Sequence, residues 1–215
     1  MLEKCELYCI TRAPVNSIGY EEMVERACAG GANIIQFRHK GLVDTVMIET
    51  AKRLRDICKK HAVFFIINNH PEVARDVDAD GVHIGQDDMS ISQARHVIGP
   101  GKLIGLSTHS FEQALKAQLK GADYIGFGPI FATPTKPDYK PIGLSDIDSV
   151  VRKVEIPVFV IGGINADNVG QVIRAGAERV AVVRAAFNAE HIETAVRNLR
   201  SQIESAKKDK IYQEI

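Results

Sequence analysis

Three polar residues alternate along the segment QFRHK, at positions 36–40. Side chains two apart on a β-strand project to one face, so Gln36, Arg38 and Lys40 would line a common surface. Two cations facing one cavity are costly unless an anion binds between them, and the arginine fork suits phosphate oxygens. The spacing predicts a phosphate clamp; the alternative is a solvated strand edge with alternating charge.

Further polar residues follow other apolar runs. Asn68 and Asn69 end one run, and Asp88 follows the next. An acidic residue near a cationic clamp suggests a magnesium ion shared with a diphosphate, although an Asp in this position also commonly caps a helix. Ser107 ends a later run, with no G-x-S-x-G elbow and no evident base partner. We therefore expect no nucleophilic serine. His83 is expected to face the packed interior.

The last third of the chain carries a second set of candidate anion ligands. A long loop at 131–137 contains Thr133, Thr135 and Lys136, and a loop of this length on an active face is usually a functional lid. Gly163 follows the next apolar run, where a glycine lets backbone N–H groups approach a phosphate. Val183 and Arg184 end the final run, in the other place where barrels of parallel strands commonly bind phosphate.

The elements that would position these residues alternate along the whole chain. Near-continuous apolar runs are typical of parallel strands buried on both faces. They lie at 5–11, 33–39, 63–68, 81–86, 103–108, 123–130, 157–163 and 179–184. Amphipathic stretches separate them, including 44–60, 111–119 after a capping Ser110, and 167–174 after Asn165.

Eight such units predict a single (β/α)8 TIM barrel over residues 1–215, with a charged tail at about 205–215 that frays. A doubly wound open sheet is the rival fold, but the first turn, TRAPVNSIG, lacks its glycine fingerprint. In a barrel the active site is built at the carboxyl ends of the strands, where all the candidate ligands fall.

Composition limits the partners and the compartment. The 215 residues contain 27 Lys and Arg against 27 Asp and Glu, so bulk charge indicates neither nucleic-acid nor membrane binding. No signal peptide or membrane span is evident, and the four cysteines lie in apolar patterns typical of reduced core residues. We expect a cytoplasmic enzyme acting on small phosphorylated molecules. Assembly into a homo-oligomer is left open.

At these residues the chain resembles the thiamine-phosphate synthase family. Seven segments match in order and spacing: QFRHK (36–40), FIINN (65–69), DADGVHIGQDD (78–88), GLSTHS (105–110), GADYIGFGPIFATPTK (121–136), VIGGI (160–164) and AGAERVAVV (175–183). The resemblance implies that an aminopyrimidine diphosphate reacts with a thiazole phosphate, with Mg²⁺ assistance and a dissociative loss of pyrophosphate.

The resemblance also implies residue roles. Gln36, Arg38, Lys40 and Asn68 would bind the pyrimidine diphosphate, and Ser107 and Lys136 would contact its diphosphate group. Asp88 and Asn69 would hold the magnesium ion. The thiazole phosphate would bind Thr133, Thr135, Gly163, Val183 and Arg184. Arg38, Lys40, Ser107 and Lys136 would thus be the catalytic set.

Three positions depart from the family pattern. Asn69 stands where a second metal carboxylate is usual, His39 replaces an acidic residue, and Arg184 replaces a small one. Two alternatives therefore stay open at this point. One is a related thiazole tautomerase, although Pro129 lies where that group resembles a histidine-bearing site. The other is a non-catalytic regulatory barrel that binds ligand, for which Asn69 is the support.

Overall fold

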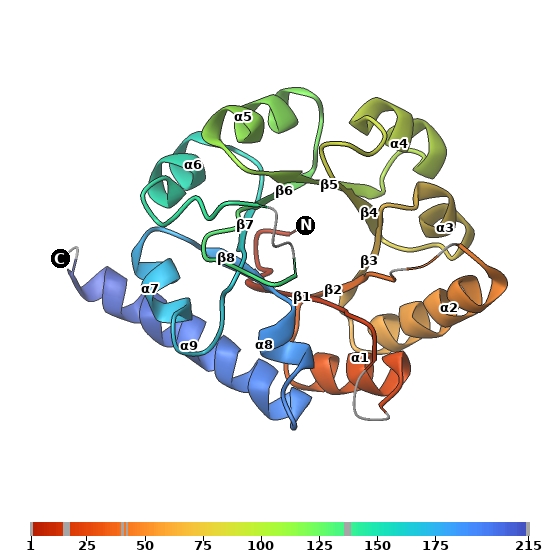
Figure 1. Ribbon diagram of the computed structural model, residues 1–215, viewed down its shortest axis with the longest axis horizontal. Helices are drawn as coiled ribbons and strands as arrows, with labels where there is room; N and C mark the ends of the chain where they lie inside the picture. The colour runs from red at the N-terminus through yellow and green to blue at the C-terminus, as the bar shows by residue number, and fades with distance from the viewer. Residues whose placement is uncertain (1, 15–17, 40, 42, 136–138, 214–215) are drawn as a thin grey trace.

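The computed structural model describes residues 2–14, 18–39, 41, 43–135 and 139–213. Eight parallel strands close into one barrel in sequence order, which confirms the predicted TIM barrel (Figure 1). They are β1 (Leu7–Ile10), β2 (Ile34–Phe37), β3 (Phe64–Asn68), β4 (Gly81–Ile84), β5 (Leu103–Thr108), β6 (Tyr124–Phe127), β7 (Val158–Ile161) and β8 (Arg179–Val182). The pairing of β1 with β8, Leu7 opposite Val180, closes the ring.

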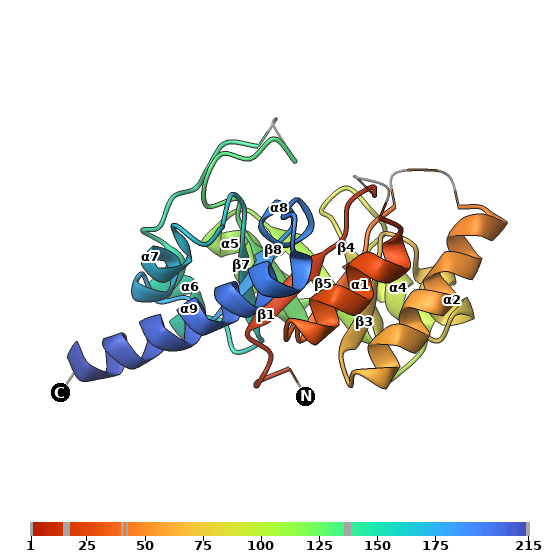
Figure 2. The same cartoon turned by 90° about the horizontal axis from the view of Figure 1, so that it is seen from below.

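Helices surround the barrel on all sides (Figure 1). They are α1 (Tyr20–Ala29), α2 (Thr45–Lys60), α3 (Pro71–Asp76), α4 (Ile91–Ile98), α5 (Phe111–Leu119), α6 (Ile147–Lys153), α7 (Val169–Arg174), α8 (Arg184–Phe187) and α9 (Ile192–Gln213). Figure 2 shows the long loop after β6 rising from one end of the barrel, with both chain termini toward the other end.

Two apolar clusters explain why the strands read as nearly continuous apolar runs. One cluster lies between the strands and the helices and includes Leu7, Cys9 and Ile35. The other fills the barrel interior and includes Tyr8, Tyr124 and Phe159. Successive strand residues point alternately into the two clusters, so both faces need apolar side chains. All four cysteines are buried and free, as the sequence predicted.

Helix starts agree with the sequence in part. The Ser110 side chain accepts a hydrogen bond from the Gln113 N–H at 3.2 Å, so Ser110 caps α5 as predicted. Asp44 caps α2 in the same way through the Met47 N–H. Asn165, however, does not cap α7.

The start of α7 lies further along than the sequence indicated. Asn165 Oδ1 accepts from the Asp167 N–H at 2.8 Å in a preceding turn, and α7 begins only at Val169. Asx side chains bind backbone two residues ahead, and that local bond competes with helix formation. The sequence pattern could not separate this turn from a first helical turn.

The C-terminal segment also differs from the frayed tail that was expected from about residue 205. It continues α9 as far as Gln213, with Ala206 buried and the Lys207 ammonium 2.6 Å from a Glu6 carboxylate oxygen. Packing against α1 and α7 accounts for this, since helices gain most of their stability from a buried face. Among the described residues, no helix combines the length and apolarity needed to cross a membrane.

Candidate active site

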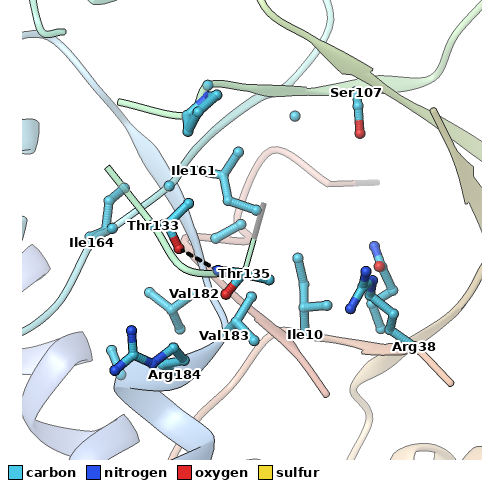
Figure 3. A pocket seen from close by; sticks show the side chains of 18 of the residues that line it. Ile10, Arg38, Ser107, Thr133, Thr135, Ile161, Ile164, Val182, Val183 and Arg184 are labelled. Carbon is cyan, nitrogen blue, oxygen red and sulfur yellow. Dashed lines mark hydrogen bonds between the residues drawn. The ribbon is translucent and has the colours of Figure 1, made fainter. Parts of the chain in front are cut away.

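A cavity of about 440 Å³ opens at the carboxyl ends of the strands, within the usual range for a ligand site. It brings together nine of the predicted site residues (Figure 3). They are Gln36, Arg38, Asn68, Ser107, Thr133, Thr135, Gly163, Val183 and Arg184. Strand-end positions spread over the whole sequence therefore meet in one cavity, as the closed barrel requires.

Gln36 and Arg38 contribute the β2 side of the cavity. Gln36 is buried, and its Nε2 donates to the Tyr8 hydroxyl at 2.7 Å. The Arg38 N–H donates to Thr11 Oγ1 at 2.9 Å, which holds the end of the strand in place. Burial lowers the pKa of the Arg38 guanidinium, because desolvation disfavours its charge. The described residues provide no carboxylate partner for this cation, so an anionic ligand would fill that role.

Ser107 lies at the end of β5, where its Oγ is 3.0 Å from His83 Nε2. His83 is buried, as predicted, and it also borders the cavity. A serine next to a histidine suggests a nucleophile and base, but the other ring nitrogen of this histidine lies 3.3 Å from the Tyr124 hydroxyl, at the place where a catalytic triad has its carboxylate. The arrangement suits a hydroxyl that binds ligand.

The loops after β6 and β7 form a second polar side. The Thr135 N–H donates to Thr133 Oγ1 at 3.3 Å. Gly163 has a φ of +67°, and a Cβ on it would lie 2.7 Å from Phe131 Cβ and 2.9 Å from the Ala132 carbonyl oxygen. Glycine is therefore required for both conformation and space, which leaves the backbone accessible to a ligand.

Arg38 and Arg184 lie on opposite sides of the cavity, with Ile10 and Val183 between them (Figure 3). Arg184 begins α8, with only Val183 between it and the end of β8. No hydrogen bond or ion pair involves the Arg184 side chain within the described part of the chain. The cavity thus has a cation on each side and apolar side chains between the two, which suits a ligand pair with two separate anionic groups.

Asn69 and Asp88, the predicted metal ligands, contact each other. Asn69 Nδ2 donates to Asp88 Oδ1 at 3.2 Å, and the Gly85 N–H donates to Asp88 Oδ2 at 2.7 Å. Asn69 has a φ of 64°, a conformation that Asn and Asp tolerate better than other side chains. Within the described ranges, no group of three or more His, Cys, Asp and Glu side chains is placed to hold a metal ion.

Lys40 and Lys136 lie outside the described residues, so their predicted roles stay predictions. The cavity also contains His109, Asn165 and Asn188, to which the sequence analysis assigned no role. The strand-end rule could have found His109 and Asn165, which follow β5 and β7. Asn188 follows α8, and no sequence pattern indicates it.

Comparison with known proteins identifies the family. The family model described as thiamine monophosphate synthase matches residues 7–186. This chain belongs to that family. It is 45% identical over 199 residues to the thiamine-phosphate synthase of Chloroflexus aurantiacus, covering 92% of each protein. The predicted family and its synthase function are thus confirmed, and its members are transferases.

Other relatives agree on the family but differ in length. The thiamine-phosphate synthase of Synechocystis is 42% identical over 202 residues, and this chain spans only 58% of its length. The solved thiamine phosphate pyrophosphorylase of Pyrococcus furiosus superposes with a TM-score of 0.87 at 39% identity, covering 94% of this chain and 96% of that one. A 3-hexulose-6-phosphate synthase structure, at 15% identity and a TM-score of 0.64, shares the fold alone.

Proposed function

We propose that this thiamine monophosphate synthase family member condenses 4-amino-2-methyl-5-hydroxymethylpyrimidine diphosphate with 4-methyl-5-(2-phosphoethyl)thiazole, releasing pyrophosphate and forming thiamine phosphate. The observation that carries this proposal is a cavity with one cation on each side, neither of which has an ion pair in the described structure. One side would bind the diphosphate and the other the phosphate monoester. The two heterocycles would then meet between the two cations, beside Ile10 and Val183.

The reaction breaks the bond from the pyrimidine methylene carbon to the diphosphate oxygen, and the bonding electron pair leaves with pyrophosphate. The thiazole nitrogen lone pair then forms the new bond to the methylene carbon. The electron-rich aminopyrimidine can carry positive charge at that carbon, which favours a dissociative path. Catalysis therefore needs stabilisation of the leaving group and positioning, without an enzyme nucleophile.

The residues on the β2 side would supply that stabilisation. Arg38 is half-buried, so its charge would act on the leaving diphosphate with little screening. Lys40 and Lys136 would add two further cations, as the family resemblance implies. Ser107 would donate a hydroxyl hydrogen bond to a diphosphate oxygen, while Gln36 and Asn68 would orient the pyrimidine.

Asp88 and Asn69 fit a magnesium site of the type completed by substrate. Mg²⁺ prefers oxygen ligands and is often held by one or two carboxylates together with substrate phosphates. This pair offers one carboxylate and one amide oxygen, and the amide nitrogen of Asn69 already holds the Asp88 carboxylate beside it. When bound there, the ion would neutralise charge on the departing pyrophosphate.

The opposite side would bind the thiazole phosphate. Thr133 and Thr135 offer hydroxyl groups, and Gly163 and Val183 offer backbone N–H groups to phosphate oxygens. Arg184 would add its own backbone N–H. The fixed contact between Gly163 and the loop after β6 would keep these donors together as the substrate arrives.

The test is release of pyrophosphate and formation of thiamine phosphate from the two purified substrates with Mg²⁺. Omission of either substrate should abolish both products, since the reaction is a condensation. A regulatory barrel would bind the ligands but form neither product. A tautomerase would isomerise a thiazole without releasing pyrophosphate, and either result would replace the proposal.

A further inference from the structure

A chain of buried hydrogen bonds crosses the barrel interior beneath the cavity. Gln36 Nε2 donates to the Tyr8 hydroxyl at 2.7 Å, and the Tyr8 and Tyr124 hydroxyl oxygens lie 3.0 Å apart. The Tyr124 hydroxyl is 3.3 Å from His83 Nδ1, and His83 Nε2 is 3.0 Å from Ser107 Oγ. The chain therefore connects Gln36 on β2 with Ser107 on β5, and both of these residues line the cavity.

The fold makes room for this chain at one glycine. A Cβ on Gly105 would lie 2.2 Å from Tyr124 Cζ and 2.4 Å from His83 Nδ1, so any side chain there would displace both rings. Tyr8, Tyr124 and Phe159 pack edge to face in the same layer, with ring centroids 5.3 to 6.0 Å apart. Packing of the rings therefore holds the two hydroxyl groups in position. Phenylalanine rings could pack in the same way, so the packing does not by itself require the hydroxyl groups.

Both tyrosines must stay protonated in this environment. Burial raises the pKa of Tyr8 and of Tyr124, because desolvation disfavours the phenolate. Each hydroxyl therefore has one hydrogen to donate and can accept one from its other neighbour. A neutral imidazole likewise donates through one nitrogen and accepts at the other.

With one hydrogen on each group, all the hydrogen bonds in this series must donate in the same direction along it. When Gln36 donates to Tyr8, the direction that satisfies every group has Tyr8 donate to Tyr124 and Tyr124 donate to His83 Nδ1. The proton of a neutral His83 is then on Nε2, which donates to Ser107 Oγ. The Ser107 hydroxyl hydrogen and the Gln36 carbonyl oxygen stay available to the cavity. In the reverse direction the Gln36 amide would be flipped, so that its carbonyl oxygen accepts from Tyr8. The Ser107 hydroxyl would then donate its hydrogen to His83 Nε2 and not to a ligand.

We propose that Tyr8, Tyr124 and His83 are positioning residues that relay hydrogen-bond direction between Gln36 and Ser107. A ligand that accepts a hydrogen bond from Ser107 thereby sets Gln36 to accept one from a ligand N–H group. The relay selects molecules that combine an anionic acceptor at one end with an N–H donor at the other. This proposal rests on the proposed function, in which an amino-substituted ring carries a diphosphate.

The first test reads the relay without any turnover. Proton–nitrogen correlation spectra of isotope-labelled histidine distinguish the ring tautomers, and the His83→Gln variant identifies the His83 signals. With inorganic pyrophosphate and Mg²⁺ bound, His83 should carry its proton on Nε2. In Tyr124→Phe the Nδ1 signal should move downfield, because that nitrogen loses its donor. Tyr20→Phe removes a hydroxyl that contacts His39 instead, and should leave the His83 signals in place.

The second test measures coupling between the two ends. Gln36→Met and Ser107→Ala are made singly and together, in the wild-type and in the Tyr124→Phe background, and kcat/KM for the pyrimidine diphosphate is measured. If Gln36 and Ser107 are connected, the effect of the double variant on kcat/KM should differ from the product of the two single effects by at least about threefold. In the Tyr124→Phe background the two single effects should multiply to within about twofold. Tyr124→Phe alone should lower this kcat/KM about tenfold while the KM for the thiazole phosphate changes less than about twofold.

The outcomes are separable. A protonated Nδ1 on pyrophosphate-bound His83, or additive effects of the two end variants in the wild-type background, would overturn the relay. If wild-type protein releases no pyrophosphate, the proposed function fails, yet the histidine spectra still decide the direction of the relay. Thermal unfolding of Tyr124→Phe shows whether the variant is folded, and Tyr8→Phe breaks the same chain one bond earlier.

Discussion

Arg38 is a half-buried cation in the cavity without a carboxylate partner among the described side chains. Desolvation lowers its pKa, so this charge costs the folded protein stability while it is ready to meet an anion. Asn69 is the opposite case, since its amide stands where the family resemblance implies a carboxylate ligand for the metal. Single substitutions can measure the stability that the Arg38 charge costs and the metal affinity that the Asn69 amide lowers.

Substitution of Arg38→Met should separate function from stability. Loss of one charge-assisted contact in the transition state costs roughly 2–4 kcal/mol, or about 30- to 1,000-fold in kcat/KM. The free energy of unfolding should stay equal or rise by up to about 1 kcal/mol, because a desolvated charge is replaced by an apolar chain. Urea unfolding and initial rates measure the two effects. The control is Arg53→Met on α2, which loses an exposed ion pair with Glu21 and should keep full activity.

Substitution of Asn69→Asp should strengthen magnesium binding. The backbone conformation at 69 suits Asp, but the new carboxylate would replace the hydrogen bond to Asp88 with repulsion between two anions. Mg²⁺ relieves that repulsion, so the magnesium midpoint of the initial rate should fall at least about tenfold, ~1.4 kcal/mol.

The thermal midpoint should rise more with added Mg²⁺ in Asn69→Asp than in the wild type, which provides a readout independent of activity. Asp88→Asn, which removes the carboxylate, is the matched control and should weaken the response. A midpoint unchanged by Asn69→Asp would place residue 69 outside the surroundings of the metal.

At the scale of elements, the strands supply fixed positions and the loops supply ligands. The loop after β6 rises above the barrel end, and its Thr133 and Thr135 line the cavity (Figure 2). Backbone hydrogen bonds from Ile130 and Phe131 to β7 and Gly162 anchor the base of this loop. A loop anchored at its base in this way can close over a substrate without disturbing the barrel.

Thr135→Ala should affect one substrate. Loss of a hydroxyl bond to a charged phosphate costs about 1.5–3 kcal/mol, so the KM for the thiazole phosphate should rise roughly 10- to 150-fold. The KM for the pyrimidine diphosphate should change little, because the other anion site lies across the cavity. Steady-state kinetics with each substrate varied in turn test this. An equal rise in both KM values would mean that the loop acts by general closure. Thr194→Ala, at an exposed position on α9, is the control and should change neither KM.

At the scale of the whole molecule, buried tyrosine and cysteine side chains couple stability to pH. Burial raises the pKa values of Tyr8, Tyr124 and Cys9, and the hydrogen bond with Cys28 together with burial raises the pKa of Cys58. A group whose pKa is raised in the folded state contributes its full stability below its unfolded pKa, and loses it as the pH rises above that value. The protein should therefore unfold in base.

The slope of the free energy of unfolding against pH counts the protons that buried side chains release on unfolding. Above about pH 10, each buried tyrosine should lower the free energy of unfolding by about 1.4 kcal/mol per pH unit, since unfolding releases its proton. Tyr124→Phe should reduce the slope by one such increment, and Tyr8→Phe with Tyr124→Phe by two. Urea unfolding across the alkaline range measures the slope. An identical slope in all three proteins would show that these hydroxyls ionise without unfolding.

The sequence alone determined the fold and most of the cavity. Eight apolar runs separated by amphipathic stretches predict a closed barrel, because parallel strands bury both faces. The strand-end rule then selected residues such as Gln36, Ser107 and Gly163, which the structure places in one cavity. The alternation of side chains along a strand is a local property of the backbone, which is why the periodicity of the sequence could reveal it.

Only the tertiary structure decided which side chains touch across the barrel. Tyr8, His83 and Tyr124 lie on three separate strands, and in the sequence they read as ordinary members of apolar runs. Contacts across a closed barrel depend on strand register and tilt, which no local pattern encodes. The same reason explains α9, whose last turns are charged in sequence but helical because packing and the Lys207–Glu6 pair hold them.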